Sequence, residues 1–453
     1  MSSSLPYPVK RRTENDCKVV AEGSKSGCQL KKVLIFPAGS EVAFEVFESI
    51  RYSPHFKVIG ANSIQDHSSF IFPVLFKLPY LHDFNFLSEL RDLIKNENVD
   101  YLYPTMDEVA LLLKSNEDFL TVKVIGSSLE SYSIANNKEK TYNFFKDILK
   151  VPKIYTKKEA VDFPLFLKPK SGYGSRGVMK INSVEELNFH FKDSINQMLI
   201  EYLPEEEFTI DCFTNKDREL LYCSPRTRER IRMGISVHSK FASNEIFEEV
   251  KTMAEIINSN LKIRFAWFFQ VKRGNDGKLA LLEIGLRPAG SSGLNRLRDV
   301  NLPLLSLFEM DGYPIQIKCN YIKGRIDRAF STKAKIDLNF NQLFIDFDDC
   351  ILINNKLNPK AIELIIHCRN EKKSVILISK HNGDLKYRLN KLKIEMLFDR
   401  VIHLKQNQSK KDYLLPNSLF VDDSFSERKN AATVQKVITF GVESIDLINS
   451  NFL

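Results

Sequence analysis

Lysines and glycines of one short segment have the types and the spacing that phosphate binding needs. A predicted strand, F-P-L-F-L-K-P-K, carries Lys168 and Lys170 at its end, and a loop with Gly172, Gly174 and Gly177 follows. Glycines let the backbone curl closely around a phosphate and present N–H donors, while lysines supply the counter-charge. The alternative is an ordinary surface turn, which the two lysines and the preceding apolar strand disfavour.

Carboxylates gather in a second segment near the end of the chain. Asp346, Asp348 and Asp349 follow one apolar run, and Asp422 and Asp423 follow another. Carboxylates at neighbouring strand ends repel one another unless a cation binds them. The pattern therefore favours a divalent metal site over the alternative of helix-capping and surface acids.

Arginines alternate in the segment S-P-R-T-R-E-R-I-R-M-G, at Arg226, Arg228, Arg230 and Arg232. In one continuous strand all of them would point to the same face. Four cations on one face repel unless anions meet them, and a polyphosphate or an acyl-phosphate would do so. For the later arginines, a solvated basic loop is an equally good interpretation.

Length and composition indicate a globular protein of several domains. The chain has 453 residues, roughly three domains at ~150 residues each. Hydrophobic residues make up 43% and charged residues 27%, so wholesale disorder is excluded. No apolar run approaches the ~20 residues of a membrane-spanning helix. The formal charge of +8 is spread over the whole chain, which suits small anionic ligands and argues against nucleic acid.

Cysteine usage and the first residues bear on the compartment. The seven cysteines are scattered, odd in number and without a C-x-x-C pair. A disulfide framework or a zinc site is therefore not expected, and a reducing, cytoplasmic compartment is. Residues 1–30 are polar and lack the apolar stretch of a secretory signal, so we expect them to form a disordered tail.

Strand and helix patterns alternate over residues 31–130. Apolar runs at 33–36 and 56–61 enclose a helical pattern over 41–51, and further strands are expected at 99–103 and 122–126. This predicts an open, mostly parallel sheet with covering helices. The first turn holds only Gly39 and is not a dinucleotide fingerprint. Asp107 and Glu108 follow a strand end, where they could contact a ligand or simply start a helix.

The later thirds of the chain show a hairpin and a second βα rhythm. Strands over 265–271 and 279–284 flank Asn275-Asp276-Gly277, a strong hairpin signal that would bring Gln270 near Glu283. After Lys335, strands are expected to end at Asp346, Ser379 and Asp422, with a helix over 359–370. The predicted fold class is therefore α/β and α+β with several domains.

Three motifs, in their order, resemble those of the ATP-grasp superfamily, in particular its carbamoyl-phosphate-synthase-like carboxylate–amine ligases. They are Phe166-Leu167-Lys168-Pro169 with its glycine loop, Leu199-Ile200-Glu201-Tyr202 followed by Glu207, and Leu282-Glu283-Ile284 with Arg287-Pro288. The resemblance covers most of 31–325. It implies a Rossmann-like preATP-grasp domain at 31–130 and an ATP-grasp domain at 131–330.

The resemblance implies how nucleotide would be held. Lys168 matches a lysine that binds the nucleotide phosphates, and Lys138 matches an earlier phosphate-contacting lysine. The hinge strand that hydrogen-bonds adenine would carry Glu201, and Glu207 matches the acid that holds ribose. The full expected nucleotide-binding set is Lys138, Lys168, Lys170, Gly172, Gly174, Gly177, Glu201, Tyr202, Leu203 and Glu207.

The same resemblance implies a metal site and a grip on the substrate. Gln270 and Glu283 match magnesium-ligand positions, and Arg228 and Arg287 would hold the activated substrate. One departure matters, because the family usually has Asn two residues after the metal Glu, where this chain has Gly285. Mg²⁺ needs hard oxygen ligands, so a second metal would be weakly held or would take a water instead. The implied cofactors are ATP and Mg²⁺, with Mn²⁺ as an alternative ion.

Residues 340–453 resemble the haloacid-dehalogenase (HAD) phosphohydrolase superfamily. Asp346-Phe347-Asp348-Asp349-Cys350 matches the first motif, D-x-D-x-[TV], except at Cys350, and Ser379, Lys411 and Asp422-Asp423 match the later motifs. Lys410 is a neighbouring candidate for the lysine. The resemblance implies a HAD-like Rossmannoid domain, and the spacing between motifs leaves no room for a large cap.

The HAD resemblance also implies roles. Asp346 would be the nucleophile that becomes an aspartyl-phosphate, and Asp348 would protonate the leaving group and then activate water. Ser379 and Lys411 would steady the phosphoryl oxygens. Asp346, Asp348 and Asp422, together with Asp423, would hold Mg²⁺.

The expected protein is therefore a two-activity enzyme. One part would join a small carboxylate to an amine with ATP through an acyl-phosphate, and the other would remove phosphate from a phosphorylated metabolite. Neither nucleic acid nor membrane is an expected partner, and a homodimer is left open. The alternative is that only one domain is catalytic and the other is a structural or nucleotide-sensing module.

Overall fold

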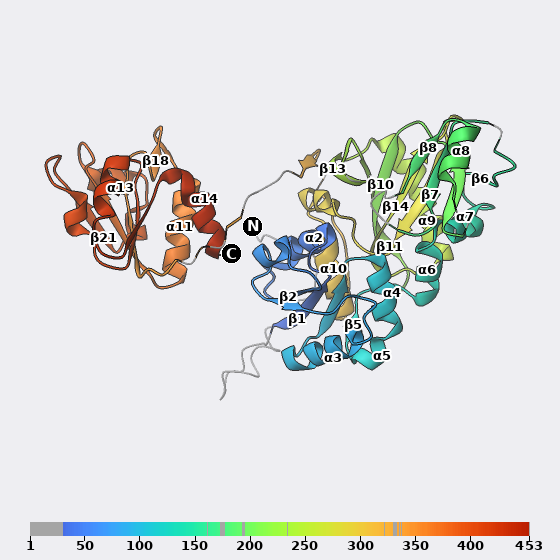
Figure 1. Ribbon diagram of the computed structural model, residues 1–453, viewed down its shortest axis with the longest axis horizontal. Coiled ribbons are helices and arrows are strands. Elements are labelled where there is room, and N and C mark those ends of the chain that lie inside the picture. Colours follow the sequence, from blue (N-terminus) through green and yellow to red (C-terminus); the bar gives the residue numbers. More distant parts are fainter. Residues whose placement is uncertain are drawn as a thin grey trace. The chain divides into compact units, whose positions relative to one another are not determined.

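The computed structural model describes residues 30–453 except 161, 173–176, 193–194, 233, 321, 329–332, 335, 337 and 453 (Figure 1). The chain divides into two compact units, residues 1–329 and 330–453. The expected disordered tail lies outside the described residues, apart from Leu30. Within the described ranges, no helix combines the length and the apolar character needed to cross a membrane.

The first sheet of unit 1 is parallel, in the order β3-β2-β1-β4-β5. Its strands are β1 (Lys31–Phe36), β2 (Phe56–Asn62), β3 (Leu75–Lys77), β4 (Tyr101–Pro104) and β5 (Lys123–Val124). Successive residues of β1 enter two different cores, with Val33 on one face and Leu34 on the other. A strand buried on both faces must be apolar throughout, which explains why the run at 33–36 has no polar residue.

Helices cover both faces of this sheet (Figure 1). They are α2 (Glu41–Ile50), α3 (Phe86–Glu97), α4 (Asp107–Ser115) and α5 (Glu117–Leu120). Helix α2 begins where Ser40 accepts a hydrogen bond from the backbone N–H of Ala43. The open parallel sheet and the helix after the first strand are thus as expected, whereas β3 had not been anticipated.

The middle of unit 1 begins with α6 (Leu129–Ala135) and α7 (Lys138–Phe145) and continues into an antiparallel sheet of order β6-β9-β7-β8. Its strands are β6 (Ile154–Tyr155), β7 (Leu165–Pro169), β8 (Met179–Ile181) and β9 (Gln197–Glu201), with α8 (Val184–His190) alongside. Strand β7 delivers Lys168 and Lys170 at its end, as the sequence predicts.

A second antiparallel sheet, of order β11-β10-β14-β15, holds the largest core of unit 1 together with α9 (Asn244–Asn260). Its strands are β10 (Glu207–Thr214), β11 (Leu220–Thr227), β14 (Phe265–Arg273) and β15 (Leu279–Gly285). The expected hairpin is confirmed: β14 pairs with β15, and Gln270 lies opposite Glu283. Gly277 in the connecting turn has φ +74°, a left-handed conformation that favours glycine.

Unit 1 is completed by a small sheet and two helices. The sheet has the order β12-β13-β16, with β12 (Arg230–Arg232), β13 (Ile235–Lys240) and β16 (Arg325–Asp327). The helices are η2 (Ser292–Arg298) and α10 (Leu302–Met310). Phe308 of α10 packs into the core beneath α2.

Unit 2 is built on a parallel sheet of order β21-β20-β17-β22-β23. Its strands are β17 (Gln342–Ile345), β20 (Ser374–Ser379), β21 (Arg400–His403), β22 (Ser418–Val421) and β23 (Val437–Phe440). The central strand β17 places Leu343 and Phe344 in separate cores on opposite faces. The carboxyl ends of β17, β20 and β22 therefore meet at one edge, where Asp346, Ser379 and Asp422 lie.

Connections in unit 2 are short. A hairpin of β18 (Leu352–Ile353) and β19 (Lys356–Leu357) and the helix α11 (Pro359–Asn370) separate β17 from β20. Helix α11 has the predicted bounds, with Asn358 as its N-cap. The remaining elements are α12 (Leu385–Lys391), η3 (Glu395–Leu397), η4 (Lys410–Tyr413), α13 (Phe425–Ala431), η5 (Val442–Ser444), α14 (Ile445–Asn449) and η6 (Ser450–Phe452). The described part of unit 2 thus carries no cap-sized insertion.

Candidate functional site

Lys168 on β7 is the most deeply buried of the candidate phosphate-binding residues in unit 1. It is 6% exposed, and its Nζ donates a hydrogen bond of 2.5 Å to Tyr142 Oη. Tyr142 in turn donates to the backbone carbonyl of Leu282 on β15, at 3.0 Å. One tyrosine on α7 therefore connects a lysine of one antiparallel sheet to a strand of the other.

The charge of Lys168 is finely balanced. Burial and the nearby charge of Lys138 together lower the pKa of Lys168 to about 7, although Glu283 and Glu207 act in the opposite direction. A bound anion would favour the ammonium form. The site is thus suited to hold a negatively charged group beside Lys168.

Lys138, the first residue of α7, joins the same cluster. Its Nζ donates to the carbonyl of Gly172 at 2.9 Å and lies 3.8 Å from Glu283 Oε2. Its backbone N–H donates to the carbonyl of Lys170 at 2.7 Å. The structure therefore brings together Lys138, Lys168, Lys170 and Gly172, four residues that the sequence analysis proposed for one purpose.

The glycine loop is only partly described. Gly172 and Gly177 have φ +119° and +70°, backbone conformations that residues other than glycine rarely adopt. Gly174 lies outside the described residues. The Nζ of Lys170 forms an ion pair with Glu139 at 2.8 Å, so this lysine is already neutralised by a neighbouring acid.

The expected adenine hinge lies at the end of β9. Glu201 exchanges two hydrogen bonds with Lys153: its backbone N–H donates to the Lys153 carbonyl at 2.9 Å, and its carboxylate accepts from the Lys153 N–H at 3.3 Å. Tyr202 follows with Lys180 Nζ 4.4 Å from its ring centroid, and Leu203 is buried.

Glu207 and Arg228 meet each other. Arg228 Nε lies 2.7 Å from Glu207 Oε1, and Lys272 Nζ lies 4.0 Å from the other oxygen. Arg228 also donates to the carbonyl of Gly234 at 3.1 Å. The residue expected to grip the substrate and the residue expected to hold ribose therefore share one ion pair.

The four arginines do not lie on one continuous strand, so the condition for their sharing one face is not met. Arg226 is buried in β11 and pairs with Asp211 at 2.8 Å, whereas Arg230 belongs to the separate strand β12 and pairs with Asp327. The chain leaves the strand conformation between the two strands, so the period of two is interrupted. Each of these two arginines therefore meets its own carboxylate.

Gln270 and Glu283 offer an amide and a carboxylate side by side on β14 and β15. Oxygen ligands of this kind suit Mg²⁺, so the pair fits the implied ion. The position of Gly285 has a physical explanation: a Cβ there would lie 2.2 Å from Cε1 of Phe268. The Phe268 ring thus occupies the space into which a side chain at position 285 would project.

Arg287 follows β15 and reaches the first sheet. Its Nε and Nη2 lie 3.1 and 3.0 Å from Asp107 Oδ2, and its guanidinium lies 5.4 Å from the Phe268 ring centroid. Asp107 is the first residue of α4, and its Oδ1 is buried without a hydrogen-bond partner. Asp107 therefore both starts a helix and orients the arginine expected at the transferred phosphate.

In unit 2, Lys410 lies between two carboxylates. Its Nζ is 3.0 Å from Asp346 Oδ1 and 2.6 Å from Asp422 Oδ2, and the residue is 3% exposed. Lys411 is exposed on the same helical turn. Of the two candidate lysines, Lys410 rather than Lys411 therefore lies at the carboxylates, because only one of two consecutive side chains on η4 can face the sheet.

Burial shapes the charges of this cluster. It raises the pKa of Asp346 to about 6, with Asp422 adding to the rise and Lys410 opposing it. Burial by itself would lower the pKa of Lys410, but the charges of Asp346 and Asp422 outweigh it and raise the pKa. The cluster thus keeps a buried cation beside a carboxyl that is easily neutralised.

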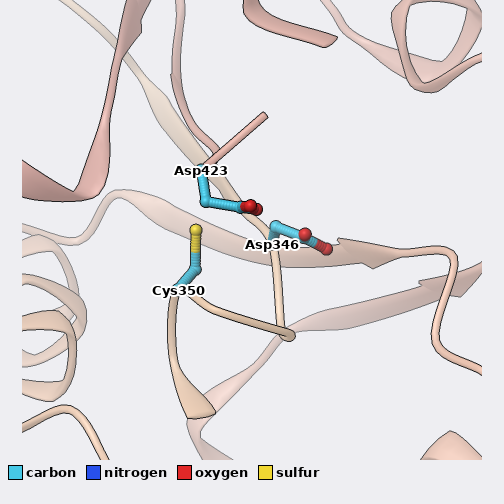
Figure 2. Close-up of side chains that lie close together, drawn as sticks. All are labelled: Asp346, Cys350 and Asp423. Carbon is cyan, nitrogen blue, oxygen red and sulfur yellow. The ribbon is translucent and has the colours of Figure 1, made fainter. Parts of the chain in front are cut away.

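Of the four carboxylates expected to hold Mg²⁺, Asp346 and Asp423 lie together beside Cys350. Figure 2 shows Asp346, Asp423 and Cys350 close together, and their donor atoms lie within 4.8 Å of one another. Asp348 instead pairs with His381 Nδ1 at 2.9 Å, because its side chain points to the end of β20. The carboxylates of Asp346 and Asp423 fit Mg²⁺. Burial raises the pKa of Cys350 far above its ordinary value, so its thiol is protonated.

Two residues of these sites had no signal in the sequence. Tyr142 is one aromatic residue among many, and His381 lies two residues beyond Ser379 with no motif of its own. Ser379 itself is buried at the end of β20, as expected. Its place two residues after a predicted strand end does not by itself single out His381.

Comparison with known proteins supports the interpretation of unit 1. Residues 193–325 match the family described as "ATP-grasp in the biosynthetic pathway with Ter operon". A D-alanine–D-alanine ligase of Fusobacterium nucleatum is 25% identical over 185 residues, which are 38% of this chain and 63% of that protein. The match thus spans less than two thirds of the relative's length.

Solved structures share the fold. An L-amino acid ligase from Bacillus licheniformis matches with a TM-score of 0.52 and 16% identity over 63% of this chain and 75% of that one. An N5-carboxyaminoimidazole synthetase from Staphylococcus aureus, complexed with ADP, matches with 0.54 and 15% over 64% and 79%. The chain is therefore a mixed α/β protein, 63–64% of which shares its fold with these two ligases, and its residues 193–325 are similar to the ATP-grasp family named above.

Proposed function

We propose that unit 1 is an ATP- and Mg²⁺-dependent ligase that joins a carboxylate to an amine through an acyl-phosphate. The supporting observation is the cluster of Lys138, Lys168 and Glu283, which places two lysines and a carboxylate around one glycine loop. Charge on a moving phosphoryl group must be neutralised by lysine, arginine and metal. The partial match to ligases of the same reaction type supports the assignment.

The proposed reaction has two steps. A carboxylate oxygen of the acid attacks the terminal phosphorus of ATP, and ADP leaves. The amine nitrogen then attacks the acyl carbon, phosphate leaves with the bonding electrons, and the nitrogen loses a proton. Mg²⁺, when held by Glu283 and Gln270, would neutralise phosphate charge.

Individual residues then have separate tasks. Lys138 and Lys168 bind phosphate oxygens. Glu207 hydrogen-bonds ribose once its ion pair with Arg228 has partly opened. Arg287, oriented by Asp107, faces the activated carboxylate. Amino acids and short peptides are the proposed substrate class.

The test is a product assay with ATP, Mg²⁺ and pooled amino acids. Lys168→Ala is expected to abolish ADP formation, whereas Lys251→Ala, on the exposed side of α9, serves as the matched control and should behave as wild type. ADP formation that persists at the wild-type rate in Lys168→Ala would reject the assignment.

We propose a second activity for unit 2, phosphomonoester hydrolysis of the HAD type. The supporting observation is the edge where Asp346 faces Lys410 and lies beside Asp423. Asp346 would be the nucleophile, Asp348 the proton donor and acceptor, and Ser379 and Lys410 would hold phosphoryl oxygens. Mg²⁺, when bound by Asp346 and Asp423, would offset the charge of an incoming phosphate.

Hydrolysis of phosphomonoesters by wild type and by Asp346→Asn tests the second activity. Loss in Asp346→Asn with ADP formation intact is the expected result. If the wild-type protein lacks one of the two activities, that result would support the alternative, in which the corresponding unit is a structural or nucleotide-sensing module.

A further inference from the structure

His381 makes a contact in unit 2 that the motifs do not account for. Its Nδ1 lies 3.0 Å from Asp348 Oδ1 and 2.9 Å from Asp348 Oδ2. Contact with both oxygens places the ring nitrogen in front of the whole carboxylate, so the bond fixes the direction in which that carboxylate faces. In the steps where Asp348 is ionised, its oxygens only accept hydrogen bonds, and Nδ1 is then the donor.

His381 is itself held in place. Its ring meets Phe347 edge-on, with centroids 5.2 Å apart and planes at 87°, and Phe347 is fully buried. Its carbonyl accepts a hydrogen bond of 2.8 Å from His403 Nε2, and the preceding strand is in register with β21. The imidazole is thus fixed by a core residue and by the neighbouring strand.

Among the described residues, Asp348 by contrast has no side-chain hydrogen bond or ion pair other than that with His381. Its side chain is 46% exposed, whereas that of His381 is 18% exposed. An exposed carboxylate without a partner samples several rotamers, and fixing one of them costs conformational entropy. The contact with His381 removes that freedom in advance.

We infer that His381 is a positioning residue that holds Asp348 for proton transfer in phosphomonoester hydrolysis. The inference rests on the phosphatase function proposed for unit 2. In the first step an Asp346 oxygen bonds to phosphorus, the ester P–O bond breaks, and the proton on Asp348 passes to the departing oxygen. In the second step a water oxygen bonds to phosphorus, one water proton passes to Asp348, and the bond to Asp346 breaks. Ester and water thus become alcohol and phosphate.

The first step offers a measurement that would not change if His381 had only a structural role. Phenyl phosphate and 4-nitrophenyl phosphate have similar shapes, but phenolate is the poorer leaving group and depends more on the proton. The value of kcat/KM reports the steps up to loss of the leaving group. General acid catalysis contributes about 10²- to 10⁴-fold to the rate. A misplaced proton donor should therefore lower kcat/KM more for phenyl phosphate than for 4-nitrophenyl phosphate.

The experiment compares both esters on the full chain with Mg²⁺. His381→Ala is expected to lower kcat/KM for phenyl phosphate by about tenfold more than for 4-nitrophenyl phosphate. His381→Asn, whose amide nitrogen can replace Nδ1 as donor, should recover most of that loss. In the Asp348→Asn background, His381→Ala should cause no further differential loss, because the proton donor is already gone.

Three results would overturn the inference: equal losses for both esters, unchanged kcat/KM in His381→Ala, or additive losses with Asp348→Asn. Failure of the underlying function looks different. In that case wild type hydrolyses neither ester, or Asp346→Asn is as active as wild type. Either result rejects the proposed phosphatase function, and with it the role inferred for His381.

Discussion

The ammonium of Lys168 donates a hydrogen bond of 2.5 Å to the hydroxyl of Tyr142, and this pair lies between the two antiparallel sheets of unit 1. Because Lys168 is buried, the tyrosine oxygen supplies much of the polar environment that its charge requires. Nucleotide binding in unit 1 should therefore depend on both residues.

Tyr142→Phe is expected to weaken ATP binding while the fold remains intact. The substitution removes the acceptor and leaves the ring 4.9 Å from Lys168 Nζ. A hydrogen bond to a charged group contributes about 1.5–3 kcal/mol, so KM for ATP should rise about tenfold or more. Steady-state ADP formation measures it, with Tyr155→Phe on the edge strand β6 as the control. An unchanged KM would contradict the assigned role.

Nucleotide affinity should fall as pH rises. The pKa of Lys168 is lowered to about 7 without ligand, and phosphate oxygens would raise it in the complex. The charged form therefore binds better: affinity is highest below pH 7 and decreases above it, until the pKa of the complex is passed. Titration of ADP by calorimetry from pH 6 to pH 9 checks this. The slope should disappear in Lys168→Met, and a slope that persists there would assign it to another group.

Lys410→Met should destabilise unit 2 strongly, because it leaves Asp346 and Asp422 buried without their cation. Breaking a buried ion pair from one side costs about 3–5 kcal/mol. Lys411→Met is the matched control one residue away and should change little, since Lys411 is exposed. Urea unfolding of the full chain in the absence of Mg²⁺ measures both. Equal effects of the two substitutions would contradict the placement of Lys410, rather than Lys411, between the two carboxylates.

Gly285→Asn should be destabilising through overlap with the Phe268 ring, which lies 2.2 Å from the new Cβ. Overpacking of this kind typically costs about 1–3 kcal/mol. Phe268→Ala combined with Gly285→Asn should cost less than the sum of the two single substitutions, because the overlap is gone once the ring is removed. The control is Gly277→Asn, in a turn with φ +74° and open space around it, a conformation that Asn tolerates. Thermal unfolding compares these variants, and Phe268→Ala alone, with wild type. A Gly285→Asn variant as stable as wild type would show that the ring moves freely.

Local signals in the sequence were sufficient for one part of the candidate sites. The turn at Asn275–Gly277 determines which residues of β14 and β15 face each other, so the pairing of Gln270 with Glu283 could be predicted. The positions of Lys168 and Asp346 at strand ends could likewise be predicted, because an apolar run stops at each of them.

Long-range contacts account for what could not be predicted. The alternation of arginines suggested one face, but Arg226 pairs with Asp211 and Arg230 with Asp327, and the strand breaks between them. The choice between Lys410 and Lys411 depends on how η4 docks against the sheet. His381 contacts Asp348, 33 residues earlier, and no local pattern encodes that distance.

The most direct test measures ADP release and phosphomonoester hydrolysis side by side in wild type, Lys168→Ala and Asp346→Asn. Two independent centres predict that wild type shows both activities, that Lys168→Ala loses only ADP release, and that Asp346→Asn loses only hydrolysis. Both activities at wild-type levels in the two variants would contradict the account.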